Sequence, residues 1–154
     1  MKKNIYLAVL LFLTGCQNEL YKNPLDDFQS EQGVYIANNG VLQSFVEEGK
    51  DVEIKGLQVA LAVQDTKEIK VTLEAGNQAQ LDAYNAKNGT NYIVLPKEMY
   101  EISQKITFMP LYAMMDVPIS LKNVKFSLEG NYALPIRITG GDVNIIRGQA
   151  ETLC

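Results

Sequence analysis

Paired carboxylates are the first candidates for chemistry in this chain of 154 residues. Glycoside hydrolysis needs two acidic side chains about 5 Å, or about 6.5–9.5 Å, apart across a cleft. Asp26 and Asp27 are instead direct neighbours, as are Glu47 and Glu48, and the second pair stands beside a turn expected at Gly49. Adjacent acids of this kind are typical of a solvated surface, so neither pair indicates a glycosidase.

Serine nucleophiles and metal centres are not favoured either. The chain contains no histidine, which is the commonest general base and zinc ligand. No Gly-x-Ser-x-Gly elbow surrounds the serines considered as nucleophiles, which are Ser44, Ser103, Ser120 and Ser127. Asp142 and Asn144 have calcium-loop spacing but lack the later acidic ligand, so a hairpin turn is the favoured interpretation of residues 140–144. We predict no catalytic residues, no cofactor and no metal.

Tyr84, Tyr92 and Tyr100 are the candidate ligand contacts. Sugar-binding surfaces stack aromatic faces on pyranose rings and add hydrogen bonds from amides. The amides near these tyrosines are Asn85, Asn88 and Asn91. A buried tyrosine ring with a bonded hydroxyl serves packing equally well, and packing is the favoured interpretation of all three.

The first sixteen residues, MKKNIYLAVLLFLTGC, have the order of a secretory signal. Two lysines precede an apolar run over Ile5–Leu13, which is shorter than the ~20 residues of a membrane-spanning helix. The segment LTGC, ending at Cys16, resembles the lipobox of bacterial lipoproteins. In that class the cysteine sulfur is acylated and the signal is cut before it. Two or three acyl chains give a stable anchor, so the resemblance implies a membrane partner reached through Cys16.

Three segments follow from this interpretation: residues 1–15 as a signal peptide, residues 16–30 as a lipidated N-terminus with a polar tether, and residues 31–154 as one domain. A disulfide between Cys16 and Cys154 is the alternative to lipidation, and the two exclude each other. Cysteine at the last position suggests a coding region that stops early, and hence a domain truncated at its C-terminus. Signal removal leaves 14 − 2 = 12 basic residues against 18 acidic ones. A net charge near −6 would repel a phosphate backbone, so no nucleic acid partner is expected.

Alternation with a period of two dominates the chain from about residue 33 onward. The expected core-facing set begins with Leu57, Val59, Leu61 and Val63 and continues in four later runs. Those runs are Ile69, Val71 and Leu73; Ile106 and Phe108; Met115, Val117, Ile119 and Leu121; and Tyr132, Leu134, Ile136 and Ile138. Strands with one apolar face each must bury that face against a second sheet. The predicted fold is all-β, an immunoglobulin-like β-sandwich.

Two prolines and one helix interrupt this pattern. Pro118 and Pro135 fall on the outward phase of their strands, and proline cannot donate to a β-ladder, so edges or bulges are expected there. A short crossover helix is predicted over residues 78–88, with Asn77 and Gln80 as a capping box and Gly89 as a left-handed stop. Its inward side is expected to carry Leu81, Tyr84 and Asn85.

Two segments resemble a known family. AYNAKNGTNYIVLPKEMYEI (83–102), followed by ITF, and NYALPIRIT (131–139) are similar to the N-terminal domain of unknown function of Bacteroidetes surface lipoproteins. The resemblance covers about residues 30–147. It implies an immunoglobulin-like sandwich on the outer membrane, often encoded near glycan-uptake systems of the starch-utilisation type. Many members carry a second domain, such as a lectin or a glycoside hydrolase, whereas this chain stops at residue 154.

The expected function is that of a non-catalytic outer-membrane lipoprotein domain, facing outside, which serves as a spacer or accessory binding module in glycan capture. Its expected partners are the membrane, and a polysaccharide or a glycan-uptake complex. The alternatives are a structural adhesin or pilus-like subunit, and the remnant of a longer glycan-binding or glycoside-hydrolase lipoprotein.

Overall fold

A computed structural model of the chain describes residues 32–125, 131–146 and 148–154. The predictions for Cys16 and the carboxylates at 26 and 27 lie outside these residues, as does Ser127. Residues 31–154 form one compact unit. None of the helices in the described ranges is long and apolar enough to cross a bilayer.

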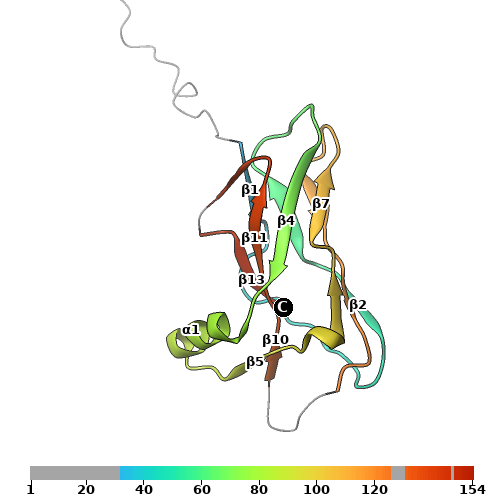
Figure 1. Cartoon of the computed structure of the whole chain (residues 1–154), viewed down its shortest axis with the longest axis vertical. Coiled ribbons are helices and arrows are strands. Elements are labelled where there is room, and N and C mark those ends of the chain that lie inside the picture. Colours follow the sequence, from blue (N-terminus) through green and yellow to red (C-terminus); the bar gives the residue numbers. More distant parts are fainter. Residues whose placement is uncertain (1–31, 126–130, 147) are drawn as a thin grey trace, which may run out of the picture. The chain divides into compact units, whose positions relative to one another are not determined.

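The described residues are mostly β-structure with one α-helix (Figure 1). The elements before residue 95 are β1 (Gly33–Ile36), β2 (Val52–Ile54), β3 (Gln58–Leu61), β4 (Ile69–Ala75), α1 (Gln78–Asn88) and β5 (Tyr92–Val94). After a 3₁₀ turn over Lys97–Met99 come β6 (Tyr100–Ile102), β7 (Lys105–Phe108), β8 (Met114–Asp116) and β9 (Ile119–Leu121). The last elements are β10 (Asn131–Ala133), β11 (Pro135–Gly141), β12 (Asn144–Ile145) and β13 (Glu151–Leu153). The predicted all-β class is therefore confirmed.

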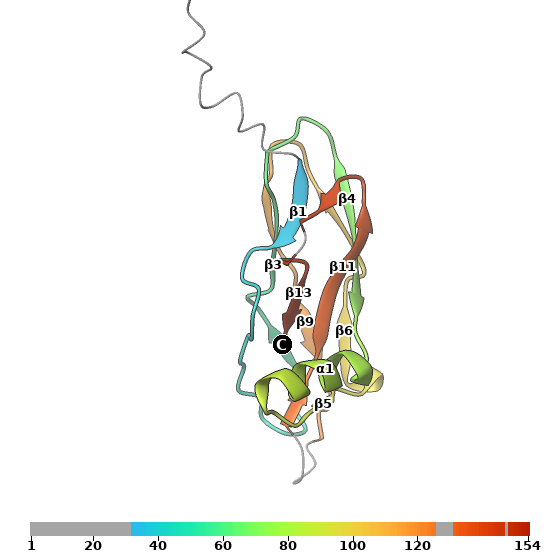
Figure 2. The same ribbon diagram turned by 90° about the vertical axis from the view of Figure 1, so that its left-hand side faces the viewer.

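Two layers of strands face each other, as Figure 2 shows from the side. One layer has the order β13-β11-β4-β7, and the other has the order β12-β1-β3-β8. The sheet β2-β9-β6 runs on from β3 and β8, while β5 and β10 form a short parallel pair. Only Ser103 and Gln104 separate β6 from β7, yet β6 pairs with β9 and β7 pairs with β4. This stretch of chain passes from one layer to the other, and the predicted β-sandwich is confirmed.

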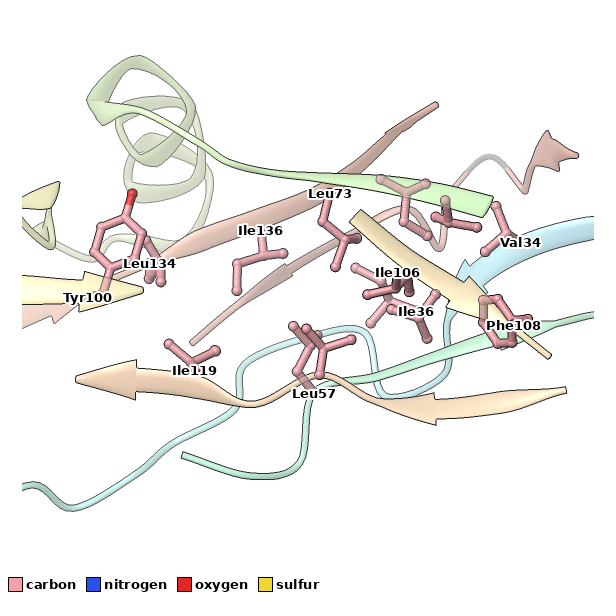
Figure 3. Packing of buried hydrophobic residues seen from close by; sticks show 14 of the residues in the cluster. Val34, Ile36, Leu57, Leu73, Tyr100, Ile106, Phe108, Ile119, Leu134 and Ile136 are labelled. Carbon is pink, nitrogen blue, oxygen red and sulfur yellow. The ribbon is translucent and has the colours of Figure 1, made fainter. Parts of the chain in front are cut away.

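The core lies between the two layers. Leu73 and Ile136 point from one layer toward Leu57 and Ile119 of the other (Figure 3), and each of these side chains is at most 1% exposed. Alternation identified most of this core, because a half-buried strand must place every second residue inward. Val63 differs from the prediction, because it lies beyond the end of β3 and is exposed. Ala60, which the predicted set leaves out, is buried.

Pro118 stands where the predicted break occurs. Gln58 pairs with Asp116 and Ile54 pairs with Ile119, so three residues on one strand oppose two on the other. This is a bulge, which separates β2 from β3 and β8 from β9. Pro118 is exposed and opposite the bulge, so its missing N–H is not needed by the ladder.

The prediction for Pro135 is wrong in its orientation. Pro135 is buried, and it is the first residue of the central strand β11, a position where proline is tolerated. The irregularity in β11 lies between Ile138 and Gly140 instead. Pro135 is buried because β11 lies in the middle of its layer, and the sequence pattern does not give the order of strands in a layer.

The hairpin expected at residues 140–144 is also wrong. Gly140 and Gly141 belong to β11, whereas β12 pairs in parallel with β1 of the opposite layer. The segment is thus a crossover between layers. Asp142 supports the crossover, because its backbone N–H donates to the Lys70 carbonyl (2.9 Å) and its Oδ2 accepts from the Lys70 N–H (2.9 Å).

The predicted helix is confirmed at both ends. α1 spans Gln78–Asn88, and Asn77 and Gln80 form the reciprocal capping box. Gly89 ends it in the left-handed region with φ 66°. Leu81 is fully buried. The helix lies with β5 at one end of the sandwich (Figures 1 and 2).

Candidate functional site

The predicted amides of α1 bind the backbone of β5. Asn85 Nδ2 donates to the Tyr92 carbonyl (2.9 Å), and Asn85 Oδ1 accepts from the Tyr92 N–H (3.0 Å) and the Thr90 hydroxyl (2.8 Å). Gln78 adds a second set, because its Oε1 accepts from the Val94 N–H (2.8 Å) and its Nε2 donates to the Tyr92 carbonyl (3.2 Å). These side chains occupy one edge of β5, while β10 pairs with the other. Their hydrogen bonds therefore hold the fold together, since a strand edge left unpaired would lack these partners.

Tyr84 and Tyr92 are brought together by this arrangement. Their ring centroids are 6.1 Å apart, with the ring planes tilted by 41°. Both rings pack against a small cluster formed by Leu81, Ala133 and Leu153. The spacing and tilt are those of a favourable aromatic pair, and both rings remain partly exposed. The pair is placed for packing and also presents aromatic surface at the α1 end of the sandwich.

Tyr100 is not part of this pair. It lies opposite Leu121 in the β6–β9 ladder, belongs to the main core and is 9% exposed. Figure 3 shows its ring beside Leu134. Burial raises the pKa of the Tyr100 phenol, because the charged phenolate would be poorly solvated there. The three tyrosines predicted together thus divide into one surface pair and one core residue.

A groove of about 500 Å³ lies next to Tyr92. One wall comes from the connection between β1 and β2, and the others come from β5, β9, β10 and the end of β13. Its residues include Leu42, Phe45, Tyr92, Asn131, Tyr132 and Cys154. Phe45 is fully exposed. A concave and mainly apolar surface with a few amides and aromatic rings is the usual form of a small-molecule site.

Most of this groove was missed from the sequence. Tyr132 was assigned to a strand face, and residues 42–46 carry no motif that would mark them. Leu42 reaches the groove because its N–H donates to the Leu153 carbonyl (2.7 Å), a contact between residues 111 positions apart. Asn131 Nδ2 is 3.5 Å from Asn91 Oδ1, which places these two amides at the same end. No local signal predicts either contact.

Cys154 lines the groove with a partly buried thiol. Its backbone N–H donates to the Leu134 carbonyl (3.0 Å), and its carbonyl accepts from the Leu134 N–H (2.6 Å). Burial raises the pKa of the Cys154 thiol to about 11. A thiol with so high a pKa is protonated at neutral pH and is therefore a poor nucleophile.

Four ion pairs lie at the surface of the described ranges. Lys50 Nζ is 2.7 Å from Glu47, and Lys122 Nζ is 2.6 Å from Glu101. Within residues 32–154, apart from the undescribed positions, no three histidine, cysteine, aspartate or glutamate side chains stand close enough to hold a metal ion.

Comparison with known proteins adds a family and a set of similar folds. The matching family model is described as an N-terminal domain and aligns with residues 27–145. No curated protein matches the chain. A Bacteroides ovatus structure provisionally described as a carbohydrate binding protein has a TM-score of 0.68 at 19% identity, over 79% of this chain and 35% of that one.

Two further structures are of unknown function. A two-domain protein from Bacteroides fragilis has a TM-score of 0.61 at 18% identity, over 84% of this chain and 46% of that one. Another Bacteroides ovatus protein has a TM-score of 0.63 at 13% identity, over 79% of this chain and 45% of that one. The chain spans less than half the length of these three structures. At these identities the likeness shows the shared fold.

Proposed function

The chain belongs to the family of N-terminal domains whose model spans residues 27–145, and we propose that it serves as a lipid-anchored, non-catalytic module in extracellular glycan capture. In this proposal Cys16 carries the lipid, and the outer membrane holds the domain facing outside. The sandwich acts as a spacer and as an accessory binding surface. A polysaccharide and a glycan-uptake complex are its proposed partners.

The groove beside Tyr92 is the observation that carries the binding part of the proposal. Tyr92 and Tyr132 offer aromatic surface, and Asn131 offers an amide, in a concavity of about 500 Å³. Aromatic faces beside amides suit pyranose rings, whose C–H faces stack while their hydroxyls form hydrogen bonds. The Bacteroides ovatus structure of the same fold, provisionally described as carbohydrate binding, supports this ligand class.

The spacer part rests on how α1 holds β5. The side-chain amides of Asn85 and Gln78 form hydrogen bonds with the backbone of β5. These bonds stiffen the α1 end of the sandwich. Four glutamates of the described surface pair with lysine or arginine, as Glu74 does with Arg137 (3.3 Å). A stable body with paired surface charges suits a module that holds other parts at a distance from a membrane.

Lipidation is tested by metabolic labelling with palmitate. The wild type should carry the label, and Cys16→Ala should not, because the sulfur is the acceptor. The matched control is Cys154→Ala, which should be labelled like the wild type. Equal labelling of the wild type and Cys16→Ala would refute the anchor.

Glycan binding is tested with the mature chain on a glycan array, and the melting temperature of each variant is measured in parallel. Tyr92→Ala should lose binding with a modest loss of stability. Tyr100→Ala should lose about 3–5 kcal/mol of stability, because a buried ring is removed. Tyr112→Ala is the control, since this tyrosine is 65% exposed and not among the residues that line the groove. If Tyr92→Ala bound every glycan as the wild type does, the groove would not be the binding surface.

A further inference from the structure

A second surface lies on the connection between β7 and β8 and the neighbouring connection after β3. Five large apolar side chains on it are at least 37% exposed; we call them the loop patch, and they are Val63, Met109, Leu111, Tyr112 and Met114. The Leu61 N–H donates to the Ala113 carbonyl (2.8 Å), which continues the β3–β8 ladder outward. This register places Val63 beside the 111–112 segment. The five exposed side chains thus lie on neighbouring segments of chain, with Met114 at the start of β8.

Leu111 in the loop patch adopts a backbone conformation that leucine disfavours. The Tyr112 N–H donates to the Met109 carbonyl (3.0 Å), closing a four-residue turn with Pro110 second and Leu111 third. Leu111 has φ 67°, and the third position of such a turn favours glycine. The Leu111 N–H donates to the Asp65 carbonyl (2.7 Å), which holds the turn in place. A leucine that is 62% exposed at a glycine-favouring position is explained neither by packing nor by the turn.

The loop patch lies at the end of the domain where the chain enters from its N-terminal side. The Ala62 N–H donates to the Gly33 carbonyl (2.8 Å), and the Val63 N–H donates to Gln32 Oε1 (3.2 Å). Gln32 is the first described residue, and α1 with β5 lies at the opposite end (Figures 1 and 2). Only 31 − 16 = 15 residues separate Cys16 from Gln32. Even fully extended they reach about 55 Å, so an anchor at Cys16 keeps this end within that distance of the bilayer and leaves it free to touch the surface.

From these contacts we propose that the loop patch rests on the lipid bilayer, with Leu111, Tyr112 and the methionines entering the headgroup region. The inference rests on the proposed lipid anchor. Leucine and methionine gain from leaving water, and a tyrosine places its ring at the interface with its hydroxyl in water. The nearest charges on the neighbouring connection are Asp65, Lys67 and Glu68, which sum to −1. The contact is therefore apolar and does not need anionic lipid.

The absence of tryptophan from the chain makes this contact measurable. Tyr112→Trp introduces a single tryptophan in the loop patch, and Ile93→Trp introduces one on β5, where Ile93 is 42% exposed. Each lipidated full-length variant is reconstituted in phosphatidylcholine vesicles containing acyl-brominated lipid. Bromine quenches only tryptophan that enters the interface, so fluorescence of Tyr112→Trp should fall about twofold while Ile93→Trp changes little.

A second substitution separates contact from folding. Leu111→Gly relieves the left-handed turn, so the chain should fold at least as stably as before while the quenching of Tyr112→Trp decreases. Palmitate-labelled protein that shows no quenching at position 112, or equal quenching at 112 and 93, would overturn the bilayer contact alone and would leave the loop patch to a protein partner. Absence of palmitate from the wild type would overturn both the anchor and this inference.

Discussion

The side-chain amide of Asn85 forms hydrogen bonds with both backbone groups of Tyr92, donating to its carbonyl at 2.9 Å and accepting from its N–H at 3.0 Å. Asn85 thereby supplies β5 with backbone hydrogen bonds of the kind that a neighbouring strand would form. The Asn-x-x-Asn-Gly-x-x-Tyr spacing has a physical meaning here: Asn85 pairs with Tyr92, Asn88 Nδ2 donates to the Tyr84 carbonyl (2.9 Å), and Gly89 turns the chain.

Asn85→Ala should lower the free energy of unfolding by about 1–3 kcal/mol, because the Tyr92 N–H loses its acceptor in a partly buried position. Asn88→Ala is the matched control. It removes one exposed bond at the helix end and should cost less. Denaturant unfolding of both variants measures the difference.

Gln78 and Asn85 share the Tyr92 carbonyl as an acceptor. Each can satisfy it when the other is removed, so the double variant Gln78→Ala/Asn85→Ala should cost more than the sum of the single variants. A double-mutant cycle by denaturant unfolding gives the coupling. Strict additivity would mean that the two side chains act independently.

Gly89→Ala should cost about 1–2 kcal/mol, because the residue has φ 66° and a side chain there is strained although it meets no atom within 4 Å. Gly89→Asn should cost less, since asparagine adopts this conformation more readily. The melting temperatures of the two variants test the order. An alanine variant as stable as the wild type would contradict the role of Gly89 as the helix stop.

Gly141 and Gly140 form a second matched pair. A Cβ on Gly141 would lie 2.6 Å from the Lys70 carbonyl oxygen, whereas one on Gly140 would meet nothing within 4 Å. Gly141→Ala should therefore cost about 1–3 kcal/mol. Gly140→Ala should stay within about 0.5 kcal/mol of the wild type. Similar losses at both positions, measured by thermal unfolding, would mean that contact with β4 is not what requires glycine.

The Cys154 thiol makes stability depend on pH in the alkaline range. Burial raises its pKa from an ordinary value of 9.0 to about 11, so the folded chain holds this proton more tightly than the unfolded chain. The stabilisation is fully present below about pH 9 and is lost as the pH rises toward about 11. Cys154→Ser removes this loss, while the ionisation of Tyr100 is common to both chains. Denaturant unfolding across this range should show the wild type falling relative to the variant, and parallel curves would contradict the assignment.

Local patterns in the sequence predicted the features that depend on local geometry. Period-two alternation identified the residues that pack in the core, and the capping residues placed α1 to the residue, because a strand face and a helix end are decided within a few neighbouring positions. The proline at 118 likewise marked a bulge through its missing N–H. The family resemblance found in residues 83–102 and 131–139 was confirmed by the match over residues 27–145.

Contacts between distant residues could be assigned only from the tertiary structure. Tyr84, Tyr92 and Tyr100 looked alike in sequence, yet strand pairing places Tyr100 in the core and the other two at the α1 end. Pro135 and the 140–144 segment were misjudged for the same reason, since burial and crossover depend on which strands become neighbours. Periodicity says which face of a strand is apolar. Only the assembled layers determine what that face meets, because pairing partners are fixed by packing over the whole domain.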